Sequence, residues 1–248
     1  MRFYTNVYQR FNEMLVRGYE NGKQFSYREE FGPTFYVPSK KESKWKTLDG
    51  ENVEPIKPGK ISDCKEFVEK YKDVHGFAIY GNDRYVAQYI SDKYPEDEIK
   101  FDISKIGLYT IDIEVAAEEG FPDVHNVSEE LLAITLQDAS TKHITCFASR
   151  PFNNTRKDVT FVLCEDEYNL IDRFLEWWQQ VSPDVITGWN CELYDIPYIV
   201  RRIERLMGEK VVKKLSPWNN VRQREIQMHG RPQITCELAG ISVIDYLD

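Results

Sequence analysis

The sequence lacks several features that would assign it directly to a functional class. Its five cysteines are scattered with no Cys-x-x-Cys pair, which argues against a zinc site or a disulfide framework and favours a reducing compartment. No run approaches the roughly 18 apolar residues of a membrane span, and the N-terminal stretch has no signal-peptide core. The four histidines form no metal-ligand or triad-like grouping, and no glycine-rich phosphate loop is present. We therefore expect a cytoplasmic chain with no membrane partner.

Length and charge set the next bounds. The 248 residues are enough to bury a core in one or two domains, and an apolar fraction of 42% argues against disorder. Acidic residues outnumber basic ones by 41 to 32, giving a net charge of −9. That balance weakens any role in coating nucleic acid without specificity, although it leaves room for a local basic groove.

The first hundred residues have the pattern of a small mixed domain. The Asn21-Gly22 pair between two alternating segments predicts a β-hairpin. Residues 63–74 have helical apolar spacing with Asp63 as N-cap, and the polar stretch 40–60 is typical of a surface loop. Further strands are predicted at residues 3–8, 11–19, 24–29, 35–37, 77–80 and 85–90. Residues 94–100, with a proline and clustered charges, are the expected linker.

The rest of the chain alternates strands and helices. Apolar runs predict strands at residues 107–115, 131–137, 143–148 and 185–187. Amphipathic spacing predicts helices at residues 166–181 and 198–207, the second ended by Gly208. Two or three antiparallel strands, a helix, and then a strand and a helix are typical of an α/β sheet with a parallel addition.

The segment Thr110-Ile-Asp-Ile-Glu-Val115 carries the first chemical signal. In a strand, Asp112 and Glu114 lie on one face, and the isoleucines between and before them lie on the other. Two carboxylates about 7 Å apart on a rigid strand repel each other, and a hard cation such as Mg²⁺ or Mn²⁺ would screen them. The alternative is an edge strand with a solvated acidic face.

A second signal follows the strand at residues 185–187. The segment 187–198 leaves this strand and enters a helix, with Pro197 near the first helical turn. Asp195 then lies at or beside the N-cap, so capping alone is one explanation for it. Because ligands of open α/β sheets bind at the carboxyl ends of strands, Asp195 is also a candidate to face Asp112 and Glu114.

These two segments together carry a resemblance. The words IDIEV at 111–115 and TGWNCELYDIPY at 187–198 resemble the Exo I and Exo II motifs of family B DNA polymerases of the T4-like bacteriophage type. Shorter matches at 120–122, 215–217 and 240–246 extend the resemblance over nearly the whole chain. It implies an α/β chain with an α+β N-terminal domain at 1–103 and an RNase H-like 3′→5′ exonuclease domain at 104–248, incomplete at its C-terminus. If phage-encoded, the protein would work in the host cytoplasm.

The resemblance also implies roles for individual residues. Asp112, Glu114 and Asp195 would be catalytic and would ligate two Mg²⁺ or Mn²⁺ ions. Asn190 would lie close to the 3′ nucleotide. Phe121 would stack on the frayed primer end, or alternatively anchor its own loop.

Residues 201–231 add a basic segment beside this candidate site. This segment contains nine basic and three acidic residues. Such an excess of positive charge is suited to binding backbone phosphates, and the alternative is a helix surface whose charges are solvated. Arg222 and Arg224 lie in the segment 221–228, expected to form a β-hairpin that in the family helps to separate primer from template. The implied partners are a DNA primer-template, a single-stranded 3′ end and the remaining polymerase portion.

One family motif is not found after Exo II. The Exo III pattern Tyr-x-x-x-Asp occurs only as Tyr168–Asp172, which precedes Exo II and lies on a predicted helix. We therefore expect a truncated or split polymerase that is inactive alone. One alternative is a non-catalytic module whose residues 1–100 bind RNA, including the polymerase's own messenger. Another is a self-contained nuclease using Asp245 or Asp248.

Overall fold

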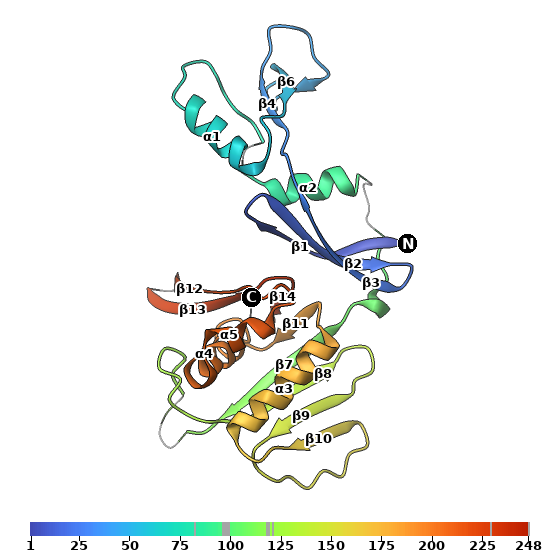
Figure 1. Cartoon of the computed structure of the whole chain (residues 1–248), viewed down its shortest axis with the longest axis vertical. Coiled ribbons are helices and arrows are strands. Elements are labelled where there is room, and N and C mark those ends of the chain that lie inside the picture. Colours follow the sequence, from blue (N-terminus) through green and yellow to red (C-terminus); the bar gives the residue numbers. More distant parts are fainter. Residues whose placement is uncertain (82, 96–99, 118–119, 121, 229, 248) are drawn as a thin grey trace. The chain divides into compact units, whose positions relative to one another are not determined.

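The computed structural model describes residues 1–81, 83–95, 100–117, 120, 122–228 and 230–247. It forms two compact units, Met1–Phe101 and Asp102–Asp248 (Figure 1). Of the helices in the described residues, none is both long and apolar enough to cross a membrane.

The first unit begins with an antiparallel meander. Strands β1 (Arg2–Arg10), β2 (Glu13–Glu20) and β3 (Lys23–Glu30) pair in that order, as the alternating pattern predicted. Asn21 and Gly22 join β2 to β3 with positive φ angles of 51° and 77°. A two-residue turn with both angles positive matches the twist of the flanking strands, which explains the Asn-Gly pair.

A second small sheet combines the strand predicted at 35–37 with two strands inside the segment predicted to be a loop. Strands β4 (Phe35–Pro38), β6 (Asn52–Ile56) and β5 (Trp45–Lys46) pair antiparallel in that spatial order. The prediction of a surface loop and turns at 40–60 was therefore wrong for the two strands β5 and β6. Val53 is the only residue of β6 that is buried, and no residue of β5 is. The apolar pattern of these two strands is therefore too short to predict them in a segment rich in lysine and proline.

The helices of this unit correct two further predictions. Helix α1 (Ile61–Tyr71) begins after Lys60, and Asp63 accepts a hydrogen bond from the Lys60 backbone N–H at 3.0 Å instead of being the N-cap. The strand predicted at 85–90 is helix α2 (Tyr85–Lys93), whose Tyr85 and Tyr89 are buried one turn apart. The predicted strand at 77–80 is reduced to a bridge between Tyr36 and Tyr80.

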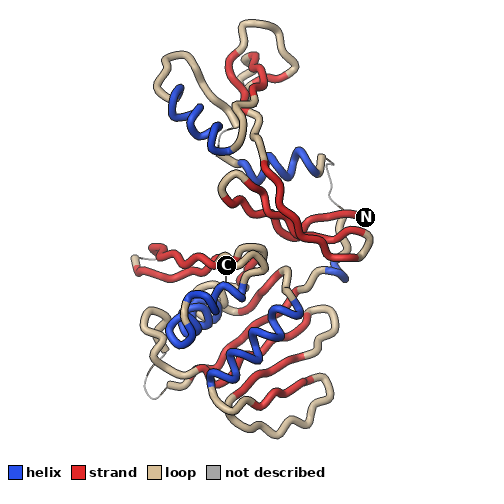
Figure 2. The backbone as a smooth tube through the Cα atoms, in the orientation of Figure 1, coloured by secondary structure: helices blue, strands red, loops and turns tan. Residues whose placement is uncertain are grey.

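The second unit is built on a six-stranded mixed sheet (Figure 2). After a short 3-10 helix η1 (Ile103–Lys105), its strands are β7 (Leu108–Val115), β8 (Leu131–Asp138), β9 (Ile144–Ala148), β10 (Val159–Leu163), β11 (Val185–Gly188) and β14 (Ser242–Asp245). The spatial order is β10-β9-β8-β7-β11-β14. Strands β7, β8 and β9 are antiparallel, whereas β11 runs parallel to β7 and β14 parallel to β11. The predicted α/β class with a parallel addition is confirmed.

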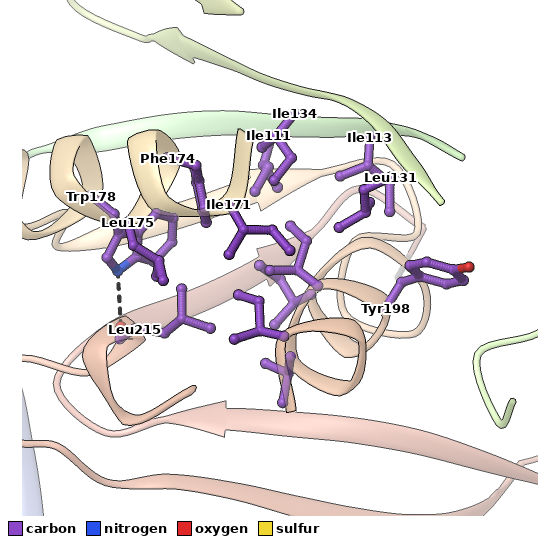
Figure 3. Packing of buried hydrophobic residues seen from close by; sticks show 14 of the residues in the cluster. Ile111, Ile113, Leu131, Ile134, Ile171, Phe174, Leu175, Trp178, Tyr198 and Leu215 are labelled. Carbon is purple, nitrogen blue, oxygen red and sulfur yellow. Dashed lines mark hydrogen bonds between the residues drawn. The ribbon is translucent and has the colours of Figure 1, made fainter. Parts of the chain in front are cut away.

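Two amphipathic helices supply the other half of the core. Helix α3 (Glu167–Val181) starts at the N-cap Asp166, whose side chain accepts the Asn169 N–H at 2.8 Å. Helix α4 (Asp195–Met207) ends at Gly208 and is followed by α5 (Glu209–Val212) and the 3-10 turn η2 (Lys213–Leu215). Figure 3 shows α3 side chains packed on isoleucines of β7 and β8, with the Trp178 indole donating to the Leu215 carbonyl at 2.9 Å.

A two-stranded hairpin completes the unit. Strand β12 (Val221–Met228) pairs antiparallel with β13 (Arg231–Leu238) in register from Val221↔Leu238 to Met228↔Arg231. The segment 221–228 is thus one strand of the hairpin, and β13 is the other. Most of β12 is exposed, whereas Ile234, Cys236 and Leu238 of β13 are buried in the core.

Candidate active site

Strand β7 presents two carboxylates on one face. Ile111 and Ile113 are 2% and 7% exposed and pack in the core, while Asp112 and Glu114 between and beyond them are exposed. This alternation is the period-two pattern of a strand with one buried face. Both acidic side chains therefore leave the sheet on the side away from the isoleucines.

The edge of β7 opens where its neighbour ends. Strand β11 pairs with β7 only from Leu108 to Thr110, after which the chain leaves the sheet through Gly188. A side chain at Gly188 would put a Cβ 2.7 Å from the Ile111 carbonyl oxygen and 2.9 Å from the Cys191 Cβ. Glycine thus permits a close turn beside the strand that carries the acidic residues.

We predict that Gly188→Ala destabilises the chain by about 1–3 kcal/mol, since a methyl group there overpacks the turn against backbone. Urea unfolding followed by circular dichroism measures the loss. Gly120→Ala is a poor control because of its positive φ, so the matched control is Gly107→Ala, where the atom nearest to the added Cβ would be 3.5 Å away and the loss should be smaller. Equal stability of Gly188→Ala and the parent chain would contradict the close packing of this turn.

The turn delivers Asp195 to the open edge of β7. Tyr194 holds the N-cap position of α4, and Asp195, 4% exposed, is the first residue of the helix. The Asp195 Oδ1 accepts the backbone N–H of Ile113 at 3.0 Å. Ile113 stands between Asp112 and Glu114, so the carboxylate of α4 is docked on the segment that bears the other two. The explanation of Asp195 as a simple N-cap therefore does not hold.

Electrostatics show that the acidic groups influence one another. Burial raises the pKa of Asp195 to about 7, and the Asp112 carboxylate acts in the same direction, while the Ile113 N–H opposes them. Burial also raises the pKa of Tyr194 to about 12, with Tyr198, Asp195 and Glu114 adding to the effect. The Tyr194 phenol thus lies within electrostatic range of both Asp195 and Glu114. A cation would replace the proton that this environment favours on Asp195.

The donor chemistry fits a hard divalent cation. All three groups offer carboxylate oxygens, the ligands that Mg²⁺ and Mn²⁺ prefer. In the side-chain positions of the described residues, no three carboxylate, imidazole or thiol groups are grouped closely enough to form a metal cluster. What the structure shows is the hydrogen bond from the Ile113 N–H to Asp195, which joins the start of α4 to the strand that carries Asp112 and Glu114.

The other predicted binding residues differ in what the structure says of them. Asn190 lies in the turn between β11 and α4 with a left-handed φ of 58°, and its carbonyl accepts the Tyr194 N–H at 2.9 Å. Phe121 lies outside the described residues. Arg222 and Arg224 are exposed on β12, and Arg224 pairs with Glu237 of β13 at 3.2 Å.

Part of the predicted basic segment serves the interior instead. Arg202 is 7% exposed and holds Glu167 of α3 with two bonds of 2.7 Å. Arg201 and Arg205 on the same helix donate to the carbonyls of His125 and Asn126 at 3.0 and 2.9 Å. These three cations fasten the segment after β7 to α4, so the phosphate-binding interpretation does not extend to the buried Arg202.

Asp245 is a neighbour of the site whose contacts the sequence did not reveal. It ends β14, opposite Gly188 in the parallel register. Its carboxylate accepts backbone N–H groups of Asn190 and Glu192. The available signal was an apolar strand ending in an acidic residue, which left its partners unspecified.

Comparison with known proteins now places this geometry in a family. A family model described as DNA polymerase family B, exonuclease domain, matches residues 65–248. The chain belongs to DNA polymerase family B. Its mixed sheet is consistent with an RNase H-like exonuclease domain. Exonuclease domains of this family are generally metal-dependent, in keeping with the carboxylates described above.

Individual relatives extend the similarity beyond this domain. The DNA-directed DNA polymerases of Enterobacteria phage T4 and Escherichia phage RB69 are 29% and 28% identical to the family B chain over 99% of its length. Each match covers 30% of the relative, so the chain spans about three-tenths of the length of these curated relatives. The DNA polymerase beta of African swine fever virus (strain Badajoz 1971 Vero-adapted) is 27% identical over 49% of the chain and 11% of its own length.

Proposed function

We propose that this chain is the N-terminal and exonuclease portion of a DNA-directed DNA polymerase. Within the whole polymerase this portion would hydrolyse the 3′-terminal phosphodiester of a mispaired primer, and the chain alone would have little activity. The observation that carries the proposal is the hydrogen bond from the Ile113 N–H to Asp195, which joins Exo II to Exo I between Asp112 and Glu114. The chain's length relative to the phage enzymes supports a role as part of a larger polymerase, whose remaining portion would carry out template-directed synthesis.

The proposed roles of the three acidic residues follow from their positions. Asp112 and Glu114, exposed on one face of β7, and Asp195 at its edge would hold Mg²⁺ or Mn²⁺. When bound, two such ions supply an activated water and stabilise the leaving oxygen. Asn190 and Phe121 would contact the 3′ nucleotide, and the exposed Arg222 and Arg224 would contact backbone phosphates.

The proposed partners and organisation complete this picture. Residues 1–103 would be the N-terminal domain of the polymerase and residues 104–248 its partial exonuclease domain. The substrate would be a primer-template with a single-stranded 3′ end. Like its phage relatives, the protein would work in the cytoplasm of a host cell.

A trimming assay tests the proposal. We expect the purified chain to bind a 5′-labelled single-stranded oligonucleotide in the presence of Mn²⁺, at least fivefold more tightly than Asp112→Asn, because this carboxylate would hold the Mn²⁺ that attracts the DNA phosphate. Little trimming should accompany binding, because the Tyr-x-x-x-Asp motif does not follow Exo II in the sequence. Equal oligonucleotide affinity of the wild-type chain and Asp112→Asn would contradict the proposed site. Robust 3′→5′ trimming that is lost in Asp112→Ala would support the self-contained nuclease instead.

A second candidate function concerns the first unit. Trp45 is 42% exposed beside Tyr36, with ring centroids 5.3 Å apart, and the Lys44 ammonium lies 5.1 Å from the Trp45 ring. Aromatic rings among lysines (residues 40, 41, 44 and 46) are suited to single-stranded nucleic acid, so this unit would bind RNA such as the polymerase's own messenger. Salt-dependent binding of an RNA hairpin, weakened by Trp45→Ala, would support it; no binding, or binding independent of salt, would remove it.

A further inference from the structure

The turn between β11 and α4 is held by a carboxylate that belongs to neither element. Asp245, the last residue of β14, accepts the Asn190 N–H on Oδ1 at 2.8 Å and the Glu192 N–H on Oδ2 at 2.9 Å. Its Oδ1 also accepts the Leu247 N–H at 2.8 Å. Both oxygens are therefore engaged by backbone donors, and two of the three donors lie within the turn.

The strand that carries this carboxylate is itself fixed to the start of the turn. Gly188 and Asp245 are partners in the parallel ladder of β11 and β14, and the Tyr246 N–H donates to the Gly188 carbonyl at 3.0 Å. Backbone pairing thus sets where the Asp245 side chain begins, and its two oxygens set where residues 190–192 lie. The turn is held at both of its ends by β14.

Residues of this turn also hold the start of α4 by hydrogen bonds. The Asn190 carbonyl accepts the Tyr194 N–H at 2.9 Å, and the Cys191 carbonyl accepts the Ile196 N–H at 3.0 Å. These two donors flank Asp195 on either side in sequence. Asn190 also has a left-handed φ of 58°, a conformation that a non-glycine residue adopts at a cost unless its surroundings hold it.

We propose that Asp245 is the positioning residue that places Asp195 beside Asp112: it holds residues 190–192, which hold the first turn of α4 against β7. This inference rests on the proposed function, since it gives the third carboxylate its place in the exonuclease site. Asp245 acts through the backbone of the turn, without itself being a metal ligand. Its two oxygens, each with a separate N–H donor, explain why a carboxylate stands at this position.

Amide hydrogen exchange tests the proposal without any cation. The Ile113 N–H donates to Asp195, so its exchange rate reports whether Asp195 is in place, and the Ile134 N–H in the core of β8 reports global opening. Relative to Ile134, we expect Ile113 exchange to be at least tenfold faster in Asp245→Ala. Asp245→Asn should show a smaller increase, because the amide keeps one acceptor oxygen for the turn but loses the other.

Asp138→Ala is the matched control. Asp138 ends β8 and likewise accepts two backbone N–H groups, those of Ser140 and Thr141, in the turn between β8 and β9. It should leave Ile113 exchange within twofold of wild type. If Asp245→Ala frees the Asn190 and Glu192 amides while Ile113 keeps its protection, or if those amides stay protected, the proposal is wrong.

A second arm separates this inference from the function on which it rests. Mn²⁺ titration followed by electron paramagnetic resonance should show at least tenfold weaker binding in Asp245→Ala than in Asp138→Ala. Unaltered Mn²⁺ binding in Asp245→Ala would overturn the positioning role. If the wild-type chain binds no Mn²⁺, the proposed function is overturned, whereas the exchange experiment still decides whether Asp245 places Asp195.

Discussion

Replacing Arg202 by methionine should lower the free energy of unfolding by about 3–5 kcal/mol, because it leaves the buried Glu167 carboxylate without its cation. The two side chains are each 9% exposed and form a bidentate pair, and Arg202 also donates to the carbonyls of Val127 and Ser128 at 2.9 Å. Urea unfolding of the full chain at pH 7 measures the change. The loss should be among the largest for any single charged residue of the second unit.

Two comparisons make this prediction specific. Arg224→Met breaks the exposed pair with Glu237, whose side chains are 59% and 40% exposed, and should cost less than about 1 kcal/mol. Adding Glu167→Gln to Arg202→Met should recover part of the stability, since the amide removes the uncompensated charge and retains an acceptor for the Leu131 N–H. Equal losses for Arg202→Met and Arg224→Met would contradict the burial of the first pair.

Asp195→Asn should stabilise the cation-free chain at pH 8 while removing a proposed metal ligand. Burial and then the Asp112 charge raise the pKa of Asp195 to about 7, above the usual value of about 3.9 in an unfolded chain. Folding therefore favours the protonated side chain. Its contribution to the free energy of unfolding is fully present below about pH 4 and is lost as the pH rises through 7. Three pKa units correspond to at most about 4 kcal/mol, and a weaker bond to Ile113 offsets about 1 kcal/mol of the gain.

The measurement is urea unfolding at pH 5 and pH 8 in the presence of EDTA. We expect Asp195→Asn to match the parent chain within about 1 kcal/mol at pH 5 and to exceed it by about 2–3 kcal/mol at pH 8. Asp138→Asn is the control, because hydrogen bonds from Ser140 and Thr141 outweigh burial and keep the pKa of Asp138 low. If Asp195→Asn is less stable than the parent chain at pH 8, burial and the Asp112 charge do not destabilise the ionised Asp195 carboxylate.

In the second unit the sequence predicted β7, β8, β9, β11, α3 and α4, but it did not predict the short edge strands β10 and β14. The helix beginning after Asp166 and the strand carrying Asp112 were predicted because their apolar residues repeat with the period of their structure. Helix α2 was mistaken for a strand because its nine residues begin with aromatic and β-branched side chains, which favour strands in isolation. Tertiary burial of Tyr85 and Tyr89 one turn apart decided in favour of the helix.

The sequence predicted which residues form the candidate site, but it did not predict the hydrogen bonds that hold them in place. The spacing of Asp112 and Glu114 on a strand, and a carboxylate at the start of the following helix, could be read directly from the sequence. The contact from Asp195 to the Ile113 N–H could not, because it depends on β11 leaving the sheet after pairing with Thr110. The roles of Arg202 and Asp245 depend on partners 35 and 55 residues away, which no local pattern encodes.

Mn²⁺ binding by the intact chain and three variants measures whether Asp112, Glu114 and Asp195 converge on a divalent cation. Electron paramagnetic resonance of the free ion gives the affinity at pH 8, where Asp195 is ionised. We expect Asp112→Asn and Asp195→Asn each to weaken Mn²⁺ binding at least tenfold, and Asp138→Asn to leave it unchanged. Equal Mn²⁺ affinity in all four proteins would contradict this convergence.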